Sequence, residues 1–226
     1  MHNILSKIKV NVNENIYLKD PESSELGRKI IQSSILLIDK IGFEAFTFRK
    51  LGQQIECPEA SIYRYFENKQ KLLIYLTSWY WGWMEYRLMI ETANIPSAEK
   101  RLENALALIT GKLTEKIFIN EMDCTKLHQI VISESTKSYL TKEVDAINKE
   151  GVFKNYKQFV ARVVLIINEI NPHYKFPNML VTTAIEGAHL QVFFAEHLPA
   201  LTNKQKNNDY ITQFYTHLVL KTITKK

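Results

Sequence analysis

The sequence has little cysteine, glycine or proline, and no apolar run long enough to span a membrane. Its two cysteines, Cys57 and Cys124, stand far apart and outside any C-x-x-C pair, which leaves no sign of a disulfide framework or a cysteine zinc site. Seven glycines and six prolines argue against a glycine-rich α/β enzyme. The apolar stretch Leu72 to Met84 is far too short to cross a bilayer. The N-terminal segment lacks the apolar core of a secretion signal, so we expect a cytoplasmic protein that does not enter a membrane.

The composition is instead that of a globular helical protein. Hydrophobic residues make up 46% of the 226 residues. They recur at spacings of three and four without sustained alternation, which predicts an all-α fold of about nine helices. Lys and Arg number 29 against 24 Asp and Glu, giving a net charge of +5. This charge is compatible with nucleic-acid binding but is too small to indicate it alone.

Two short helical patterns meet at a tight turn in the segment Thr47–Lys71, TFRKLGQQIECPEASIYRYFENKQK. Phe48, Leu51 and Ile55 fall on one side of the first helix, and Pro58 suits the first position of the second. The spacing predicts a helix-turn-helix. Six residues of its second helix are left facing outward: Glu59, Ala60, Ser61, Tyr63, Arg64 and Tyr65. Two tyrosines and an arginine on an open helix face supply donors for the base edges and phosphates of a DNA major groove.

The residue order around this segment resembles the DNA-binding domain of the TetR family of bacterial transcriptional regulators. The resemblance runs from Ser24 to about Met84, and its most specific part is the tyrosine, aromatic and lysine spacing of IYRYFENK. The residues that carry it are Phe46, Thr47, Lys50, Leu51, Gly52, Ile55, Ser61, Ile62, Tyr63, Tyr65, Phe66, Lys69, Leu72 and Leu73. It implies a three-helix DNA-binding domain at 24–84 with its helix-turn-helix at 47–66, and a larger helical effector-binding and dimerisation domain at 85–226. Residues 1–23 precede the resemblance, and we expect them to form a mobile arm or a packing segment. Contact of their lysines with DNA phosphates is the alternative.

Two positions depart from the family pattern. Glu56 stands in the turn where glycine is usual, and a left-handed backbone there costs a residue other than glycine about 1 kcal/mol. Either the turn differs or the strain is tolerated. Gly52 replaces the common alanine, which keeps the side chain small at a cost of up to about 1 kcal/mol in helix propensity. Neither change removes a DNA-contacting group.

The resemblance implies that ten residues contact DNA. Three are expected to clamp phosphates: Tyr63, Tyr65 and Lys69. Four occupy base-facing positions: Pro58, Glu59, Ala60 and Arg64. Three more are expected to contribute beside them: Thr47, Arg49 and Ser61. Thr47 is equally suited to capping its helix, and Arg49 also reads as an ordinary surface arginine. Arg64 is the expected specificity residue, because an arginine pairs bidentately with guanine.

Further helices are predicted after this domain, at about 68–90, 97–113, 123–133, 136–149, 152–170, 177–198 and 209–223. The helix at 177–198 carries a row of small residues, which permits close helix approach. In the resembled family the two C-terminal helices of each subunit form a four-helix bundle with the partner. The resemblance therefore implies a homodimer, with six interface residues: Ala184, Gly187, Ala188, Ala195, Phe214 and Leu218. Packing within one chain is the alternative reading of the small residues.

The family also implies a small-molecule effector, and the aromatic content of the C-terminal two thirds favours a hydrophobic or aromatic one. Seven residues are candidates for its pocket: Trp83, Tyr86, His128, Tyr156, Phe159, Glu186 and His189. For each of them a packed aromatic or a hydrogen-bonded core group is the commoner role. No cofactor and no metal are implied.

The whole pattern predicts a ligand-responsive regulator, a repressor that binds a palindromic operator as a homodimer. Two other classes stay open. An all-α enzyme would use His128 with Glu121, Asp123 and Cys124 nearby, although this spacing matches no H-E-x-x-H or paired-cysteine motif, so we identify no catalytic residue. A helical interaction protein would use its aromatic helix to bind a partner. Substitution of Arg64 separates these readings, because only the regulator loses its binding activity.

Overall fold

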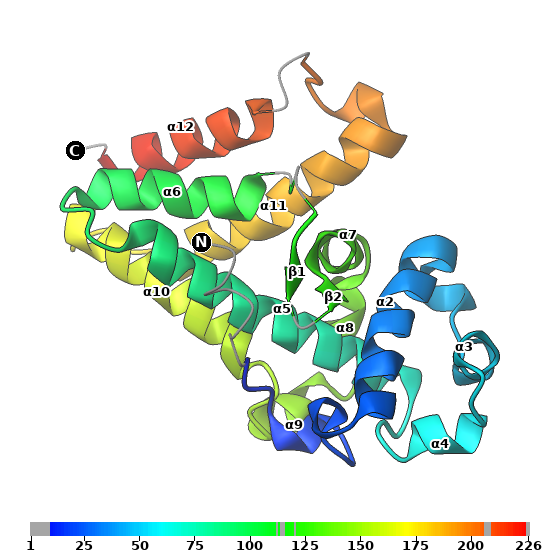
Figure 1. Ribbon diagram of the computed structural model, residues 1–226. Helices are drawn as coiled ribbons and strands as arrows, with labels where there is room; N and C mark the ends of the chain where they lie inside the picture. The colour runs from blue at the N-terminus through cyan, green and yellow to red at the C-terminus, as the bar shows by residue number, and fades with distance from the viewer. Residues whose placement is uncertain (1–9, 112, 114–115, 120, 206–208, 225–226) are drawn as a thin grey trace. The chain divides into compact units, whose positions relative to one another are not determined.

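The computed structural model describes residues 10–111, 113, 116–119, 121–205 and 209–224 (Figure 1). The all-α prediction is confirmed, since this part of the chain forms eleven α-helices and a single pair of two-residue strands. The strands β1 (Phe118–Ile119) and β2 (Met122–Asp123) are antiparallel. None of the helices described is long and apolar enough to cross a membrane.

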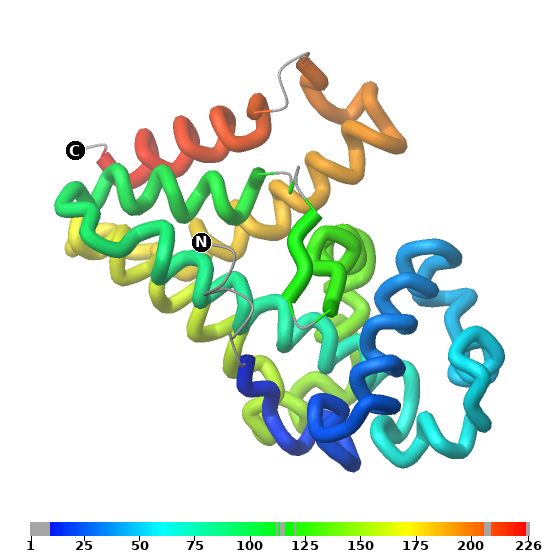
Figure 2. The backbone as a smooth tube through the Cα atoms, in the orientation of Figure 1, coloured from blue at the N-terminus to red at the C-terminus, as the bar shows by residue number. Residues whose placement is uncertain are grey.

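The chain forms two compact units. The first contains Met1–Trp83 and Leu113–Asn155, and the second contains Met84–Lys112 and Tyr156–Lys226. The first unit is therefore larger than the predicted DNA-binding domain, because 113–155 pack with it. Figure 2 shows this arrangement in the tube, where the green segment of β1, β2 and α7 (Cys124–Glu134) lies beside the blue helix α2 (Glu25–Ala45), against which α7 packs.

The first unit is built on α2. The helix begins where Ser24 accepts a hydrogen bond from the amide of Gly27. It is interrupted at Gly42, whose φ of 76° is not helical. The other helical elements of the unit are η1 (Glu14–Ile16), η2 (Pro21–Ser23), α3 (Phe48–Ile55), α4 (Glu59–Tyr63), α8 (Thr136–Tyr139), α9 (Val144–Lys149) and the first part of α5 (Lys69–Thr92). Helices α3 and α7 and strand β2 all pack on α2.

The described part of the predicted arm packs against the rest of the first unit, to which it belongs. Val10 and Ile16 are buried, and the amide of Leu18 donates to the carbonyl of Tyr65 at 2.8 Å. The amide side chain of Asn13 donates to the carbonyl of Glu150 at 2.9 Å. Residues 10–23 therefore form a packing segment, while residues 1–9 lie outside the described part of the chain.

The prediction of one helix at 136–149 is wrong. Helix α8 ends at Tyr139, and α9 begins only at Val144. Leu140, which was expected on the buried stripe of this helix, is 75% exposed, and α9 has no buried residue. Helices of this length are marginal without a packed apolar face, so the segment breaks into two short pieces.

The second unit contains the end of α5, α6 (Ala98–Thr110), α10 (Lys154–Ile170), α11 (Pro177–His197), η3 (Pro199–Leu201) and α12 (Tyr210–Thr224). Ser97 caps α6, at the start predicted for this helix. Helices α6, α11 and α12 pack on one another, and the hydroxyl of Thr110 donates to that of Thr212 at 2.8 Å. The side chain of Asn171 donates to the carbonyl of Ile223 at 2.7 Å, which ties the end of α10 to α12.

Candidate nucleic-acid interface

The helix-turn-helix is formed by α3 and α4, and local sequence signals explain both ends of α3. The Thr47 hydroxyl caps the helix by accepting from the amide of Lys50 at 3.2 Å. Phe48, Leu51 and Ile55 are buried, as their spacing predicted. The helix packs on both α2 and α4, so its orientation fixes that of α4.

The turn after α3 adopts the left-handed backbone despite its glutamate. Glu56 has φ 56° and ψ 46°, so the strain of about 1 kcal/mol is tolerated. The amide of Cys57 then donates to the carbonyl of Gly52 at 2.9 Å. A Cβ added to Gly52 would lie 2.7 Å from the carbonyl oxygen of Cys57, which is closer than real Cβ contacts. The absence of a side chain at Gly52 therefore permits the close approach of the backbone in this turn.

Helix α4 is short and presents mainly exposed side chains. Pro58 is the residue before its first turn, and Ile62 anchors the helix with an exposure of 0%. The Tyr63 ring packs edge-to-face on Phe48, with ring centroids 5.0 Å apart, while 47% of the residue stays exposed. This contact orients Tyr63 without burying it.

Most of the predicted DNA-contacting residues are accessible. Six of them are exposed: Thr47, Arg49, Pro58, Ala60, Tyr63 and Arg64. Glu59 and Ser61 are half-buried. Arg64 forms no ion pair or hydrogen bond with any described residue, so its guanidinium is available to a ligand. Gln53 and Gln54 of α3 are also exposed, although the sequence analysis did not single them out.

The prediction that Tyr65 faces outward is wrong. The residue is 3% exposed, and its hydroxyl shares a hydrogen bond with that of Ser24 at 2.8 Å. The Lys19 ammonium lies 5.1 Å from the centre of the ring. Helix α4 ends at Tyr63, so helical periodicity does not apply to Tyr65.

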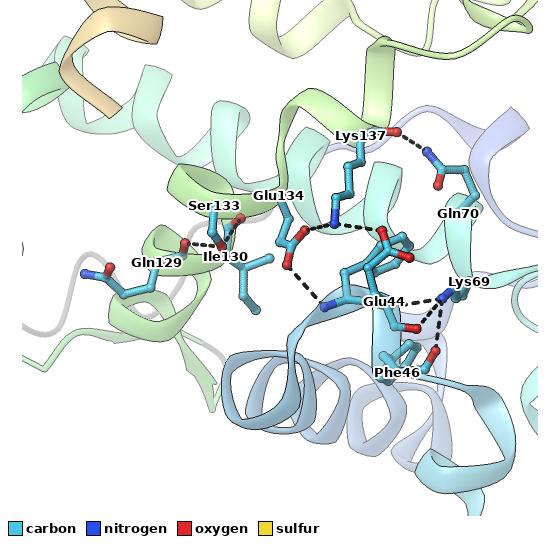
Figure 3. A network of polar contacts seen from close by, with 10 residues as sticks. Glu44, Phe46, Lys69, Gln70, Gln129, Ile130, Ser133, Glu134 and Lys137 are labelled. Carbon is cyan, nitrogen blue, oxygen red and sulfur yellow. Dashed lines mark hydrogen bonds and ion pairs between the residues drawn. The ribbon is translucent and has the colours of Figure 1, made fainter. Parts of the chain in front are cut away.

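Lys69 is engaged within the protein. Its ammonium donates to the carbonyls of Phe43 at 3.0 Å, Glu44 at 3.1 Å and Phe46 at 3.2 Å (Figure 3). These contacts use all three ammonium hydrogens. The predicted phosphate contact would require Lys69 to leave these carbonyls. One sequence signal could have indicated that Lys69 binds carbonyls. Gly42 interrupts the preceding helix, and the carbonyls at a helix end need donors from elsewhere.

The seven candidate effector residues divide between the two units. Trp83 and His128 lie in the first unit and are buried there. The Tyr80 hydroxyl and His128 Nδ1 are 2.8 Å apart, and Tyr80 also packs edge-to-face on Trp83. These contacts make Trp83 and His128 core residues of an aromatic cluster. The same unit has a cavity of about 400 Å³, lined in part by Tyr75. Neither Trp83 nor His128 lines it.

The other five effector candidates belong to the second unit. The Tyr156 hydroxyl donates to Glu186 Oε1 at 3.3 Å, and burial together with the Glu186 carboxylate raises the pKa of Tyr156. Burial lowers the pKa of His189 to about 4, so this imidazole is neutral at pH 7. Phe159 is fully buried, whereas Tyr86 is 38% exposed.

The small-residue row of α11 faces its own chain, so its prediction as a dimer interface is wrong. Ala184, Ala188 and Ala195 are buried within the second unit, where α11 packs on α6 and α12. A Cβ added to Gly187 would lie 2.2 Å from the hydroxyl oxygen of Tyr215 on α12. Close intramolecular packing thus accounts for the row.

The two remaining dimer candidates are exposed. Phe214 is 56% exposed and Leu218 is 38% exposed, and their spacing of four places them on one side of α12. Leu190 and Phe193 are 53% and 37% exposed on α11. Apolar side chains therefore remain on the outer surface of both C-terminal helices.

The residues weighed for an enzyme have separate structural roles. Glu121 accepts from the Gln32 side chain at 2.8 Å. Asp123 caps α7 through the amide of Lys126 at 3.0 Å, and Cys124 is buried. In the described part of the chain, no group of three or more His, Cys, Asp or Glu residues is placed to hold a metal ion.

The N-terminal helices match a known family. Residues 30–76 fit the model of the TetR N-terminal domain, described as bacterial regulatory proteins of the tetR family. A comparison with curated protein sequences finds none that matches the chain.

Solved structures share the fold at low sequence identity. The fatty acid degradation regulator FadR from Bacillus halodurans superposes with a TM-score of 0.60 at 15% identity, covering 88% of this chain and 98% of that one. AibR in complex with isovaleryl coenzyme A and operator DNA gives 0.56 at 16% identity, over 84% and 97% of the two chains. The superantigen PfiT gives 0.55 at 14% identity, over 90% and 97%.

These findings define the class first: the chain is an all-α protein with a helix-turn-helix at its N-terminal end. The predicted resemblance is confirmed, because residues 30–76 match the model of the N-terminal domain of the TetR family of bacterial regulatory proteins. The matching family consists of regulators and not of enzymes.

Proposed function

We propose that this protein is a ligand-responsive transcriptional repressor that binds a palindromic operator as a homodimer through α3 and α4. The observation that carries the proposal is the position of the family domain. Its residues 30–76 contain all of α3 and α4, and the exposed Arg49, Tyr63 and Arg64 lie within it. The first unit would bind DNA, and the second would hold the effector and the partner subunit.

Within the interface, Arg64 is proposed as the main source of sequence specificity. Its guanidinium is exposed and forms no ion pair with a described residue, so DNA binding costs no internal contact. A bidentate pair with guanine is worth about 1–3 kcal/mol of discrimination. Ala60 suits a thymine methyl group, while Thr47 and Tyr63 suit phosphate oxygens. With Tyr65 buried and Lys69 engaged, phosphate binding rests on fewer groups than the sequence predicted.

The homodimer is proposed to form through the outer surfaces of α11 and α12. Leu190, Phe193, Phe214 and Leu218 leave apolar area exposed there, and exposed apolar surface of this kind is typical of a protein interface. A two-fold dimer brings the two recognition helices to successive major grooves, which is the geometry that a palindromic operator requires.

The effector is proposed to be a hydrophobic or aromatic small molecule held in the second unit. The buried Phe159 and His189 and the Tyr156–Glu186 pair offer apolar walls with few polar groups. The complex of AibR with isovaleryl coenzyme A makes acyl-coenzyme A thioesters the first compounds to test. By population shift, the ligand would favour a state whose recognition helices no longer match the half-site spacing.

Selection of bound sequences from random duplex DNA tests the proposal. We expect one palindrome to be enriched by the purified protein. Arg64→Ala should weaken binding to it by roughly 10- to 100-fold, which corresponds to losing one bidentate base contact. Lys175→Ala removes an exposed cation of the second unit and serves as the matched control. No enrichment at low salt would refute sequence-specific binding and favour the interaction-protein reading.

A further inference from the structure

The backbone that joins α2 to α3 takes hydrogen-bond partners from several other parts of the first unit. Gly42, with φ 76° and ψ 158°, interrupts the hydrogen-bond ladder of α2. The next four residues, Phe43–Phe46, form what we name the connector, and α3 begins two residues later at Phe48. Amides and carbonyls at a helix end are stabilised only when other groups pair with them. The partners of the connector therefore determine how firmly α3 is held.

The carbonyl side of the connector is bound by lysines of the helix-turn-helix domain itself. Lys69 donates to the carbonyls of Phe43, Glu44 and Phe46, and Lys50 Nζ donates to the carbonyl of Ala45 at 2.7 Å. All four carbonyls thus have a cationic donor. These contacts are independent of 113–155.

The Phe43 amide is bound by a carboxylate of α7, and a lysine of α8 pairs with that carboxylate. Glu134, the last residue of α7, accepts a hydrogen bond from the amide of Phe43 through Oε1 at 3.2 Å. Its Oε2 lies 2.7 Å from the Lys137 ammonium of α8, and that ammonium also lies 2.8 Å from Glu44 Oε1 (Figure 3). The Gln70 side chain donates to the Lys137 carbonyl, which ties α8 to the start of α5.

The Phe43 ring adds a second contact with the same lysines. The Lys69 ammonium lies 4.8 Å from the ring centre, and the Lys137 ammonium lies 5.9 Å from it. Both distances are within the range of cation–π attraction. One aromatic side chain of the connector is thus held by a cation of the DNA-binding domain and by a cation of α8.

The two carboxylates on Lys137 differ in burial. The Glu134 side chain is 12% exposed and pairs with a backbone amide, whereas the Glu44 side chain is 80% exposed. An exposed ion pair contributes little, while a part-buried carboxylate that caps an amide contributes much more. The hydrogen bonds to Glu134 and Glu44 raise the pKa of Lys137, so it stays charged at neutral pH.

We propose that Glu134 and Lys137, which we name the latch, are positioning residues for DNA binding. The latch holds the connector and so fixes the direction of α3 and, through it, of α4. The proposal deepens the proposed function, because it names the segment of the chain whose movement changes DNA affinity. A shift of α7 along α2 would release the amide of Phe43 and loosen the recognition helix.

The latch is separable from the packing of α7 on α2. The remaining contacts include the ion pair of Lys126 on α7 with Asp39, and the hydrogen bond between Gln32 and Glu121, a residue that precedes α7. Leu127, Ile130 and Val131 are buried along α7. Loss of the latch should therefore loosen the connector locally and leave the rest of the unit folded.

Hydrogen exchange followed by mass spectrometry tests the latch without DNA. Glu134→Met removes both the amide acceptor and the charge, whereas Glu134→Gln keeps an acceptor and removes only the charge. We expect amide exchange in 43–55 to rise roughly tenfold or more in Glu134→Met and less in Glu134→Gln. Exchange in 25–38 should stay unchanged. Glu44→Gln, which alters only the exposed carboxylate, is the matched control and should leave 43–55 unchanged.

Binding to the operator selected by the wild-type protein gives the second measurement. We expect affinity to fall in the same order as exchange rises, by roughly tenfold in Glu134→Met. If amide exchange in 43–55 is unchanged in Glu134→Met, the latch proposal is wrong. It is also wrong if exchange rises while the affinity of this variant for the operator stays that of the wild type. A wild-type protein that selects no operator refutes the proposed function instead, and the exchange data still decide whether Glu134 holds the connector.

Discussion

The helix-turn-helix and the C-terminal helix pair offer opposite lessons about reading side chains from a sequence. In α3 and at the end of α4 the structure leaves exposed two of the predicted DNA-contacting residues, Arg49 and Arg64. In α11 the small residues expected at a partner's surface are buried against the same chain. The first prediction used an ordered set of polar and aromatic residues. The second used the position of the helix pair in the resembled family and the small size of the residues. Small size permits close approach without specifying which helix approaches.

The largest effect on stability is expected where α11 and α12 approach each other most closely, at Gly187. Gly187→Leu places a side chain where a Cβ alone would lie 2.2 Å from the Tyr215 hydroxyl oxygen. Tyr215 is buried and has little room to move, so we expect a loss of at least about 3 kcal/mol in the free energy of unfolding. Denaturant unfolding measures it. Thr183→Leu, exposed on the same helix, is the control.

The outcome for Gly187 also tests the correction to the dimer interface. If the small-residue row faces a partner subunit, Gly187→Leu should abolish dimerisation and leave the monomer's unfolding free energy close to that of the wild type. That result would contradict the intramolecular role of the row.

The second effect concerns the exposed apolar residues of α12. The double substitution Phe214→Ser with Leu218→Ser removes apolar area that the proposed dimer would bury, at about 25 cal/mol per Å². We expect the dimer dissociation constant to rise at least about tenfold, which analytical ultracentrifugation measures. Gln213→Ser, also exposed on α12, should have no effect. A dimer as tight as the wild type would place the interface elsewhere.

The third effect returns to the helix-turn-helix. Alanine at position 52 would gain about 1 kcal/mol of helix propensity. Its Cβ would lie 2.7 Å from the carbonyl oxygen of Cys57, and because that atom is backbone, the turn itself must shift. We expect Gly52→Ala to lower the free energy of unfolding by about 1–2 kcal/mol net. Gln53→Ala on the same helix should change it far less, since Gln53 is exposed.

A more stable Gly52→Ala protein would show that the turn relaxes without cost. The glycine would then be unrelated to the tight turn, and α3 would tolerate the residue common in the family. Thermal unfolding of both variants beside the wild type decides between the two outcomes.

Local signals determined how much of the fold was predictable. Asn68, Ser97 and Asp123 cap the helices that they were predicted to start, because a cap depends on residues three positions away. Tyr65 was wrongly predicted to face outward because α4 ends two residues before it. The carbonyl contacts of Lys69 were not predicted because its partners are distant in sequence. Lys69 contacts carbonyls 23 to 26 positions away. The partner of Glu134 at the end of α2 lies 91 positions away, and no local pattern indicates such a pair.

The smallest effect is expected at the strained turn of the helix-turn-helix. Glu56 has a φ of 56°, which glycine adopts without penalty. Glu56→Gly should remove strain worth about 1 kcal/mol, and the greater entropy of glycine in the unfolded chain offsets part of this gain. We expect a net gain of a few tenths of a kcal/mol, measured by denaturant unfolding. Asn94, also at positive φ, provides the comparison as Asn94→Gly in the second unit.

The same substitution separates strain from charge at the DNA-facing surface. Glu56 is exposed and acidic, so its removal should also raise operator affinity slightly through reduced repulsion of phosphates. Glu56→Gln keeps the strain and removes the charge. If Glu56→Gln raises affinity as much as Glu56→Gly while only the glycine variant gains stability, the turn's strain affects folding and its charge affects binding. Equal stability of both variants would show that the left-handed turn is not strained.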